Sequence, residues 1–330
     1  MASISNEAKS ARLRVHSLLD ESNNDSEWDK AQEKLREAVA LSSECLGPED
    51  DDTLEAKTIL AYNLRQGEEY QEAERIDRVV HAMRHRLFGP DGVRTAESLN
   101  NIALDLKGQG RSHEALGLEE RALKIFISTY GEKSRDTQAS MNNLANSFHR
   151  HGRYQDAAHL HEETLQLQVT TLGKDHFETI ITMDMLGVDY RELGQVDQAV
   201  THQEEAVQLA TAALGEANKT TIRCVANLAT TYQRLGTADS KQKALAALER
   251  ALQLCRQTYG EDSPDTVRMM NNLSVVYARS GRFREALPLQ GATYEHNRRS
   301  LGANHPNTLM SEDNFEYIMR ELGLTRAEIV

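Results

Sequence analysis

Amide side chains recur at one fixed position of a repeated segment in this sequence. The asparagines concerned are Asn101, Asn143, Asn227, Asn272 and Asn314. An amide offers both a hydrogen-bond donor and an acceptor, so a row of amides can hold the backbone of an extended peptide whatever its side chains are. Helix packing does not demand asparagine, which is a middling helix former. The alternative interpretation is that these amides bond between neighbouring repeats and fix their stacking.

Basic side chains form a second row, six or seven residues after the asparagine position. The row consists of Arg65, Lys107, His149, Arg150, Arg191, Arg234 and Arg279. In a chain with a formal net charge of −13, such a row would favour acidic peptides, because guanidinium forks pair well with carboxylates. The alternative is that long basic side chains near helix C-termini only complement the helix dipole.

One repeat departs from the asparagine pattern. Met185 takes the asparagine position, Asp184 precedes it, and Ile181 and Val188 stand at other positions of the same face. We expect these apolar side chains to form a pocket for a hydrophobic anchor in the middle of the row. The alternative is drift within the repeat that has no consequence for binding.

Histidines and glutamates invite a metal or catalytic hypothesis, but their spacing does not support one. Five histidines fall within one repeat, and His81 and His85 lie four apart on a predicted helix. No HExxH string, phosphate-binding glycine loop or nucleophile motif accompanies them. Glutamate pairs recur with the repeat, and we expect both members to be solvated charge on outer helix faces. The pairs are Glu119-Glu120, Glu162-Glu163 and Glu204-Glu205. The sequence therefore predicts no enzyme, no catalytic residue, no metal ion and no cofactor.

The elements that position these side chains follow from a period in the sequence. Threonines stand 42 residues apart at Thr53, Thr95, Thr137, Thr179 and Thr221, followed after 45 by Thr266 and after another 42 by Thr308. After most of these threonines an apolar residue follows at position 7, a small residue at 8, a large one at 11, glycine at 15 and alanine at 20, with Ala244 displaced by a three-residue insertion. These spacings predict a helix, a glycine turn and a second helix in each unit.

Three local irregularities carry predictions of their own. Gly67 lies one place earlier than the turn glycine of the other units. An insertion at residues 237–242 is expected to lengthen the turn between two helices as a tolerated loop. Trp28, in a degenerate first unit, is expected to pack in the core or the cap.

The pattern resembles the tetratricopeptide repeat, and the 42-residue spacing, the NNLA string and endings such as Leu172-Gly173 resemble the kinesin light chain variety. The resemblance covers about Thr53 to Gly323. It implies an all-α, right-handed superhelical solenoid whose first helices line a concave groove. It also implies a scaffold or adaptor that binds a protein or peptide partner in that groove. We expect a degenerate capping repeat at residues 1–52, six repeats at 53–306 and a capping helix at 307–330.

Composition narrows the partners further. The acidic balance counts against nucleic acid and against anionic membranes. Three separated cysteines without a CxxC pair, and a start without a signal peptide, predict a cytoplasmic protein. We expect Cys224 and Cys255 to pack within helices. Two alternatives stay open: an enzyme or small-molecule binder with a pocket in the groove, and a structural module that self-associates. The sequence leaves the oligomeric state open.

Overall fold

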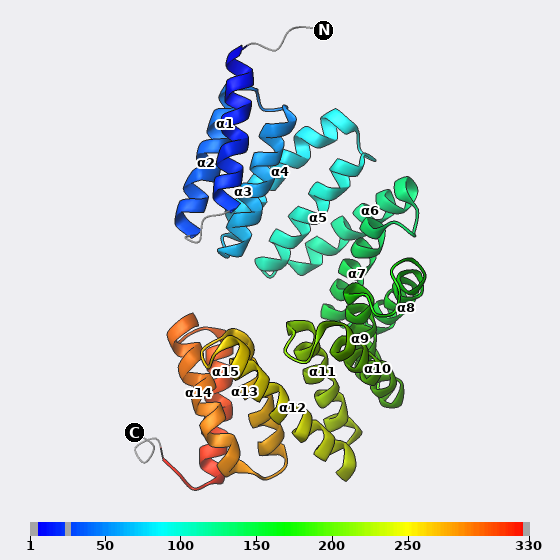
Figure 1. The fold of residues 1–330 in the computed structure, drawn as a ribbon, viewed down its shortest axis with the longest axis vertical. Helices are drawn as coiled ribbons and strands as arrows, with labels where there is room; N and C mark the ends of the chain where they lie inside the picture. The colour runs from blue at the N-terminus through cyan, green and yellow to red at the C-terminus, as the bar shows by residue number, and fades with distance from the viewer. Residues whose placement is uncertain (1–5, 24–27, 326–330) are drawn as a thin grey trace. The chain divides into compact units, whose positions relative to one another are not determined.

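The computed structural model describes residues 6–23 and 28–325, and within these ranges every regular element is an α-helix (Figure 1). The helices are α1 (Asn6–Asn23), α2 (Trp28–Cys45), α3 (Asp51–Gln66), α4 (Tyr70–Phe88), α5 (Val93–Gly108), α6 (Ser112–Tyr130), α7 (Arg135–Arg150), α8 (Tyr154–Thr171), α9 (Phe177–Glu192), α10 (Val196–Leu214), α11 (Lys219–Leu235), α12 (Ala238–Tyr259), α13 (Pro264–Arg279), α14 (Phe283–Leu301) and α15 (Pro306–Glu321). The predicted all-α fold of helix–turn–helix repeats is confirmed.

The chain divides into two compact units. Unit 1 is Met1–Gly152 and holds α1 to α7, and unit 2 is Arg153–Val330 and holds α8 to α15. Within each unit every helix packs against the next one along the chain. Each unit therefore buries its core between consecutive helices, as repeat proteins do.

The repeated threonine ties the first helix of a repeat to the preceding turn. Thr95 Oγ1 donates to the carbonyl of Gly89 at 2.8 Å, and Thr266 Oγ1 donates to the carbonyl of Gly260 at 2.7 Å. Three residues before the threonine stands the N-cap residue, whose side chain accepts from the helix backbone in α3, α9, α11, α13 and α15, as Ser263 does for α13. In α5 this residue is Gly92, which has no side chain to cap with. The threonines that recur in the sequence therefore mark the start of the first helix of each repeat.

The small residue at position 8 marks the closest approach of the two helices of a repeat. Ala61, Ala103, Ala145 and Ala229 are all fully buried at this position. On α9 the position is Gly187, where a Cβ would lie 3.1 Å from the carbonyl oxygen of Ala199 and closer still to Gln203. A side chain here would push α10 away from α9.

Trp28 explains the displaced glycine of the first complete repeat. A Cβ on Gly67 would overlap the ring of Trp28, whose Nε1 donates to the carbonyl of Asn63 at 3.4 Å. The left-handed turn residue is still at position 15, where Glu68 has φ 62°. The displaced glycine therefore makes room for Trp28, and the turn keeps its place with a non-glycine residue. Trp28 thus packs on the turn at Gly67, but 36% of the residue stays exposed, so it is not part of the buried core.

The insertion at residues 237–242 does not form a longer loop, so that prediction is wrong. Thr237 caps α12 by accepting from the backbone N–H of Ser240, and the helix starts at Ala238. The extra residues lengthen α12 to 22 residues, against 19 in α14. Because a capping threonine is followed by good helix formers, extending the helix has a lower free energy than forming a longer loop.

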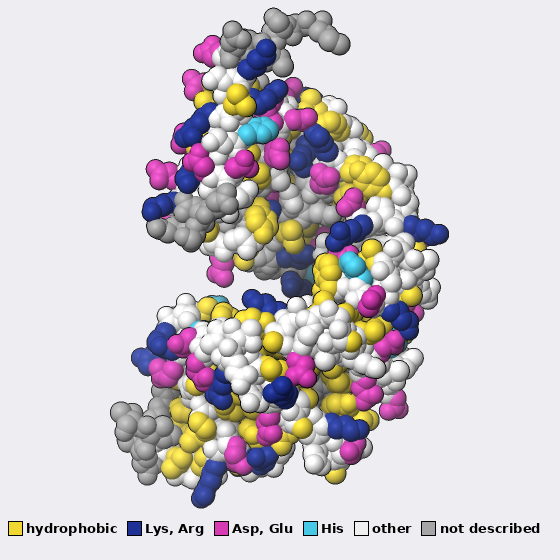
Figure 2. Space-filling model, in the orientation of Figure 1, with side chains coloured by type: hydrophobic (Ala, Val, Ile, Leu, Met, Phe, Trp, Pro, Cys, Tyr) yellow, Lys and Arg dark blue, Asp and Glu magenta, His cyan; other side chains and the backbone are white. Residues whose placement is uncertain are grey.

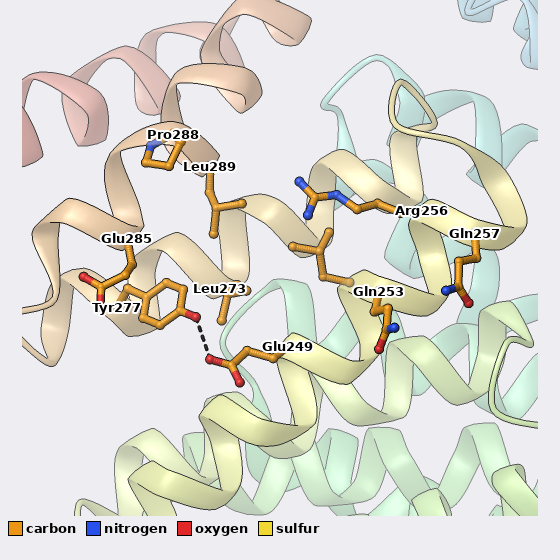
Figure 3. A pocket seen from close by; sticks show the side chains of 10 residues that line it. Glu249, Gln253, Arg256, Gln257, Leu273, Tyr277, Glu285, Pro288 and Leu289 are labelled. Carbon is orange, nitrogen blue, oxygen red and sulfur yellow. Dashed lines mark hydrogen bonds between the residues drawn. The ribbon is translucent and has the colours of Figure 1, made fainter.

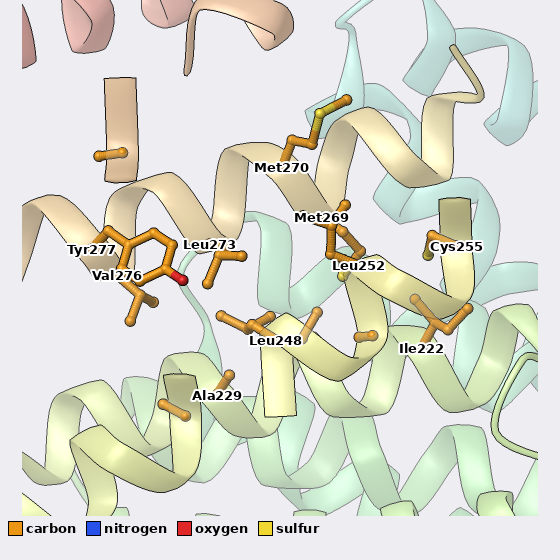
Figure 4. Close-up of a cluster of buried hydrophobic side chains, with 14 of the residues drawn as sticks. Ile222, Ala229, Leu248, Leu252, Cys255, Met269, Met270, Leu273, Val276 and Tyr277 are labelled. Carbon is orange, nitrogen blue, oxygen red and sulfur yellow. The ribbon is translucent and has the colours of Figure 1, made fainter. Parts of the chain in front are cut away.

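The largest buried cluster of unit 2 lies where α11, α12 and α13 meet (Figure 4). Leu248 and Leu252 of α12 pack against Met269 and Leu273 of α13, with exposures of 3% or less. Cys255 is fully buried in the same cluster, as is Cys224 of α11 elsewhere in the unit, and both thiols are free. The prediction that these two cysteines pack within helices is confirmed.

Candidate functional site

The candidate site lies on the first helix of each repeat, which we call the A helix; the second is the B helix. The A helices of unit 2 are α9, α11, α13 and α15, and each contacts the next. Those of unit 1 are α1, α3, α5 and α7. The A-helix face of a unit consists of the residues at positions 2, 5, 6, 9, 12 and 13 after the repeat threonine.

Four of the five predicted asparagines keep their amides free. Their exposure is partial or full, and none makes a side-chain hydrogen bond to another described residue. These are Asn101 and Asn143 in unit 1, and Asn272 and Asn314 in unit 2. Asn227 differs, because its Nδ2 donates to Asp184 Oδ2 at 2.8 Å. The row thus serves both interpretations: Asn227 bonds between neighbouring repeats, and the other four are available to a ligand.

A polar cluster stands where the apolar pocket was expected. Asp184 is fully buried and accepts from Asn227, and Arg223 Nε lies 3.6 Å from its Oδ2. Burial raises the pKa of the Asp184 carboxyl. Val188 is only 6% exposed and belongs to the core, so it is not a wall of the expected apolar pocket, whereas Ile181 is partly exposed. Met185 itself is partly exposed on the A-helix face.

Most of the basic row is already neutralised. Lys107 Nζ lies 2.6 Å from Glu119 Oε1, with only 12% of its side chain exposed. Arg191 Nε lies 2.9 Å from Glu192, and Arg234 contacts the other oxygen of the same carboxylate at 2.9 Å. Buried opposite charges stabilise one another only when both are retained. Lys107 and Arg191 are therefore structural residues first, and a ligand would compete with their partners.

Two arginines of the row are not paired. Arg150 of α7 and Arg279 of α13 are exposed, and neither makes an ion pair with a described residue. Arg234 is 51% exposed despite its contact with Glu192. His149 is partly exposed. Positive charge is therefore available at single points, not along a continuous row.

A buried polar position on the B helices was missed by the sequence reasoning. It lies 24 residues after the repeat threonine and holds Asp77, Glu119, His161, Gln203 and Gln290, all at 2% exposure or less. Its partners lie on A helices: Arg65 donates to Asp77, His161 Nδ1 lies 2.6 Å from Asp189 Oδ2, and Gln290 Nε2 donates to the carbonyl of Ser311 at 3.2 Å. The signal was a polar residue recurring inside an otherwise apolar stripe.

Members of all three glutamate pairs contact other residues, contrary to the expectation of solvated charge. Glu119 is buried against Lys107, Glu163 lies 3.7 Å from His159, and Glu205 lies 2.7 Å from Lys174. The hydroxyl of Tyr232 donates to Glu204, and that of Tyr277 to Glu249, each at 2.5 Å. Tyr190 donates to Glu162 in the same way. These contacts join the tyrosine at position 11 of one repeat to the B helix of the preceding repeat. Burial, with the neighbouring carboxylate, raises the pKa of Tyr277 to about 12.

Two hollows in unit 2 bear on the small-molecule alternative. One is an open groove of about 680 Å³ between α12 and α14, with Leu273 and Tyr277 of α13 at its base (Figure 3). The other, of about 530 Å³, lies among α13, α14 and α15 and is lined by Arg268, Asn271 and Met310 among others. Both are open to solvent on one side and mix polar with apolar walls, unlike the enclosed apolar cavities that hold most small ligands.

The surface carries both signs of charge. Figure 2 shows Lys and Arg side chains interspersed with Asp and Glu over the visible face of each unit. Among the described residues, no cluster of three or more His, Cys, Asp or Glu side chains has the arrangement to hold a metal ion. In the part of the chain that the structure describes, no helix has the length and hydropathy to span a bilayer.

A stack of helical hairpins with the same side-chain type repeated on successive first helices defines a helical-repeat protein. A family model described as tetratricopeptide repeat matches residues 58–128, 136–212 and 221–295, more than half of the chain. The chain belongs to the tetratricopeptide repeat family.

Several solved structures are similar to this chain. A kinesin-light-chain-like protein of Podosopora anserina with nearly identical TPR-like repeats is 25% identical, covering 64% of this chain and 97% of its own, at a TM-score of 0.55. BtubC (BKLC) from P. vanneervenii is 20% identical, with 79% and 94% covered and a TM-score of 0.56. The likeness to kinesin light chain-type repeats is confirmed.

A third similar structure belongs to a larger protein. It is a signal transduction ATPase with numerous domains and a tetratricopeptide repeat sensor, from Pyrococcus horikoshii. It is 16% identical, covering 94% of this chain and 45% of that one, at a TM-score of 0.65. A search of curated proteins finds no significant match.

Proposed function

We propose that the chain is a protein-interaction scaffold and that unit 2 binds an extended segment of a partner protein along α11, α13 and α15. The observation that carries the proposal is the pair of free amides on Asn272 and Asn314. They occupy the same position of consecutive A helices, and those helices contact each other. Free amides repeated on one face are binding groups that the fold itself does not use.

The spacing of the amides suits an extended backbone. Packed helices lie about 8–10 Å apart, and an extended chain advances about 3.3 Å per residue. Consecutive amides would therefore meet every third residue of the segment. Each amide can donate to a carbonyl and accept from an N–H. Such contacts fix the direction of the backbone and leave the side chains to set specificity.

Preference for acidic segments would come from the arginines of unit 2. Arg279 is exposed and unpaired among the described residues. Arg234 is 51% exposed, and Arg268 is 42% exposed beside Asp265 at 2.9 Å. Arg191 is largely buried against Glu192, so we propose no direct contact between Arg191 and the bound segment. We propose a moderate acidic preference, weaker than seven free cations would give.

We also propose a cytoplasmic location. All three cysteines are unpaired, and Cys45 is exposed as a free thiol. Exposed free thiols persist in reducing compartments.

The test is fluorescence polarisation of the full chain with a library of acidic extended peptides. In the variant Asn272→Ala/Asn314→Ala the Kd is expected to rise at least about tenfold, which corresponds to about 1.4 kcal/mol. The matched control is Gln242→Ala/Gln257→Ala, which removes two exposed amides from α12. Higher salt should weaken binding in the wild type.

The proposal that the asparagine amides bind the segment would be contradicted by either of two results. One is an equal loss of peptide affinity in both variants, and the other is an unchanged affinity in the asparagine variant. If no peptide binds, size-exclusion chromatography over a concentration series is the next measurement. A concentration-dependent size would then favour the self-associating module over the peptide scaffold.

A further inference from the structure

Unit 1 exposes large apolar side chains on its A-helix face. At position 9, Tyr62 of α3 is 58% exposed and Leu104 of α5 is 42% exposed. In unit 2 the same position holds the buried Val188, the polar Thr230, the partly exposed Val275 and Tyr317, which is 41% exposed on α15. Single exposed apolar residues are ordinary on protein surfaces. Here two of them occupy one repeat position on successive A helices, so they share a face.

The two helices are joined at both ends of this face. Arg65, one turn after Tyr62, donates to Asp105 at 3.0 Å, and Asp105 directly follows Leu104. At the other end, Arg94 of α5 lies 2.5 Å from Asp51 of α3. The apolar pair is therefore held on a fixed frame, which lowers the entropy cost of binding to it.

Acidic side chains border the apolar pair. Glu55 and Glu97 stand at position 2 of the same helices, two turns before Tyr62 and Leu104, and both are exposed. Glu55 makes no hydrogen bond or ion pair with a described residue, and among the described residues Glu97 has an ion pair with Arg84 alone, at 3.6 Å. These carboxylates are free to meet a cation from solvent.

The basic side chains of the same face are already paired with carboxylates, Arg94 with Asp51 at 2.5 Å and 48% exposure. Arg65 is 9% exposed between the buried carboxylates of Asp77 and Asp105, and Lys107 is neutralised by Glu119. The basic row that would favour acidic peptides is thus turned inward on α3 and α5. The surface that remains is apolar and acidic.

We propose that the α3–α5 face of unit 1 is a second docking surface, for a cationic segment of a partner protein. The segment would place an apolar side chain on Tyr62 and Leu104 and a lysine or arginine at Glu55 and Glu97. Two helical turns separate these levels by about 10 Å, which an extended chain covers in about three residues. The free amide of Asn101 lies between the two levels, at position 6 of α5. This docking surface lies in unit 1 and selects cationic segments, whereas the proposed function places an acidic segment on unit 2. The docking surface therefore does not depend on the proposed function.

The test uses the full chain and two labelled peptides that differ only in charge. One carries lysines three residues before leucines, and its twin carries glutamates instead of the lysines. In fluorescence polarisation the cationic peptide is expected to bind the wild type at least about tenfold more tightly at low salt than at 0.5 M. Glu55→Gln alone should weaken it several-fold, and Glu55→Gln/Glu97→Gln at least about tenfold.

The apolar part is tested separately. Tyr62→Ala/Leu104→Ala should weaken the cationic peptide at least about tenfold, because exposed side chains can be removed without unfolding the unit. Its matched control is Val79→Ala, which removes a side chain that is 44% exposed on α4. Far-ultraviolet circular dichroism should be unchanged in all of these variants.

Two results would overturn the docking surface: no binding of the cationic peptide to the wild type, or binding that the glutamate and apolar variants leave unchanged. The Asn272→Ala/Asn314→Ala variant keeps the two proposals apart. It should impair acidic peptides and leave the cationic peptide alone. Loss of both peptides in that variant would contradict the independence of the two sites.

Discussion

Units 1 and 2 differ in the buried polar side chains that join their helices. In unit 1 the polar contacts between A and B helices join full charges: Arg65 lies between Asp77 and Asp105, and Lys107 contacts Glu119. In unit 2 the same buried position uses an amide, as in Gln290 with Ser311, and tyrosine hydroxyls such as that of Tyr277, which donates to Glu249, join neighbouring repeats. Only His161 with Asp189 brings two titratable groups together at the buried position there.

The difference teaches that a repeat specifies a polar contact at this place but not its charge. Forming a buried ion pair carries a large desolvation free energy, and removing one partner of the pair destabilises the fold strongly. A hydrogen bond from a hydroxyl to a half-exposed carboxylate involves smaller free energies in both cases. At this buried position unit 1 should therefore be more sensitive than unit 2 to substitution and to pH.

The largest effect is expected from Arg65→Met. The change leaves Asp77 and Asp105 buried without a cation, and breaking a buried pair costs about 3–5 kcal/mol. Trp28 is the chain's one tryptophan and lies in unit 1, so urea unfolding followed by its fluorescence reports on that unit. The control is Arg75→Met, whose side chain is 74% exposed and 3.7 Å from Glu72; it should change the free energy of unfolding by less than about 0.5 kcal/mol. Similar losses in the two variants would remove the contrast between buried and exposed pairs.

The next effect is a pH dependence in unit 1. Burial, opposed by the Arg65 guanidinium, raises the pKa of Asp105 to about 7. Between its ordinary value near 4 and about 7, the folded chain keeps a proton that the unfolded chain releases. Stability from this group is therefore present at low pH and is lost as pH rises through that window.

Urea midpoints from Trp28 fluorescence at pH 5 and pH 8 measure this dependence. The wild type should lose more stability between the two than Asp105→Asn, which has no proton to release. Equal pH slopes in the two proteins would assign the dependence to other groups.

The smallest effect is expected in unit 2, from Tyr277→Phe. The variant removes the hydrogen bond to Glu249, whose carboxylate is exposed and can be hydrated instead. The free energy of unfolding should fall by about 1 kcal/mol, measured by circular dichroism. Tyr62→Phe is the matched control, because the Tyr62 hydroxyl contacts no described residue. A loss from Tyr277→Phe as large as that from Arg65→Met would erase the distinction between the units.

The sequence predicted the repeat architecture because capped helix starts, small contact residues and turn glycines recur at one spacing. It also predicted that the asparagines share one position of the A helices, where four of them have free amides. It did not predict which cations are free. Arg65 and Arg279 belong to the same row, but the first is buried by an aspartate on its own B helix and another on the next A helix, and no single-helix pattern contains that information.

The same limit applies to residues 237–242, where the extra residues became helix and not loop. The sequence showed the added length, and only the cap at Thr237 decided how it was used. Ala244 stays fully buried after the extension, so the core of the repeat keeps its register. Residues 238–243 are thus a natural insertion point for engineering. A spectroscopic label or one further helical turn, about 5.4 Å of length, could be added there to report on partner binding without rebuilding the repeat.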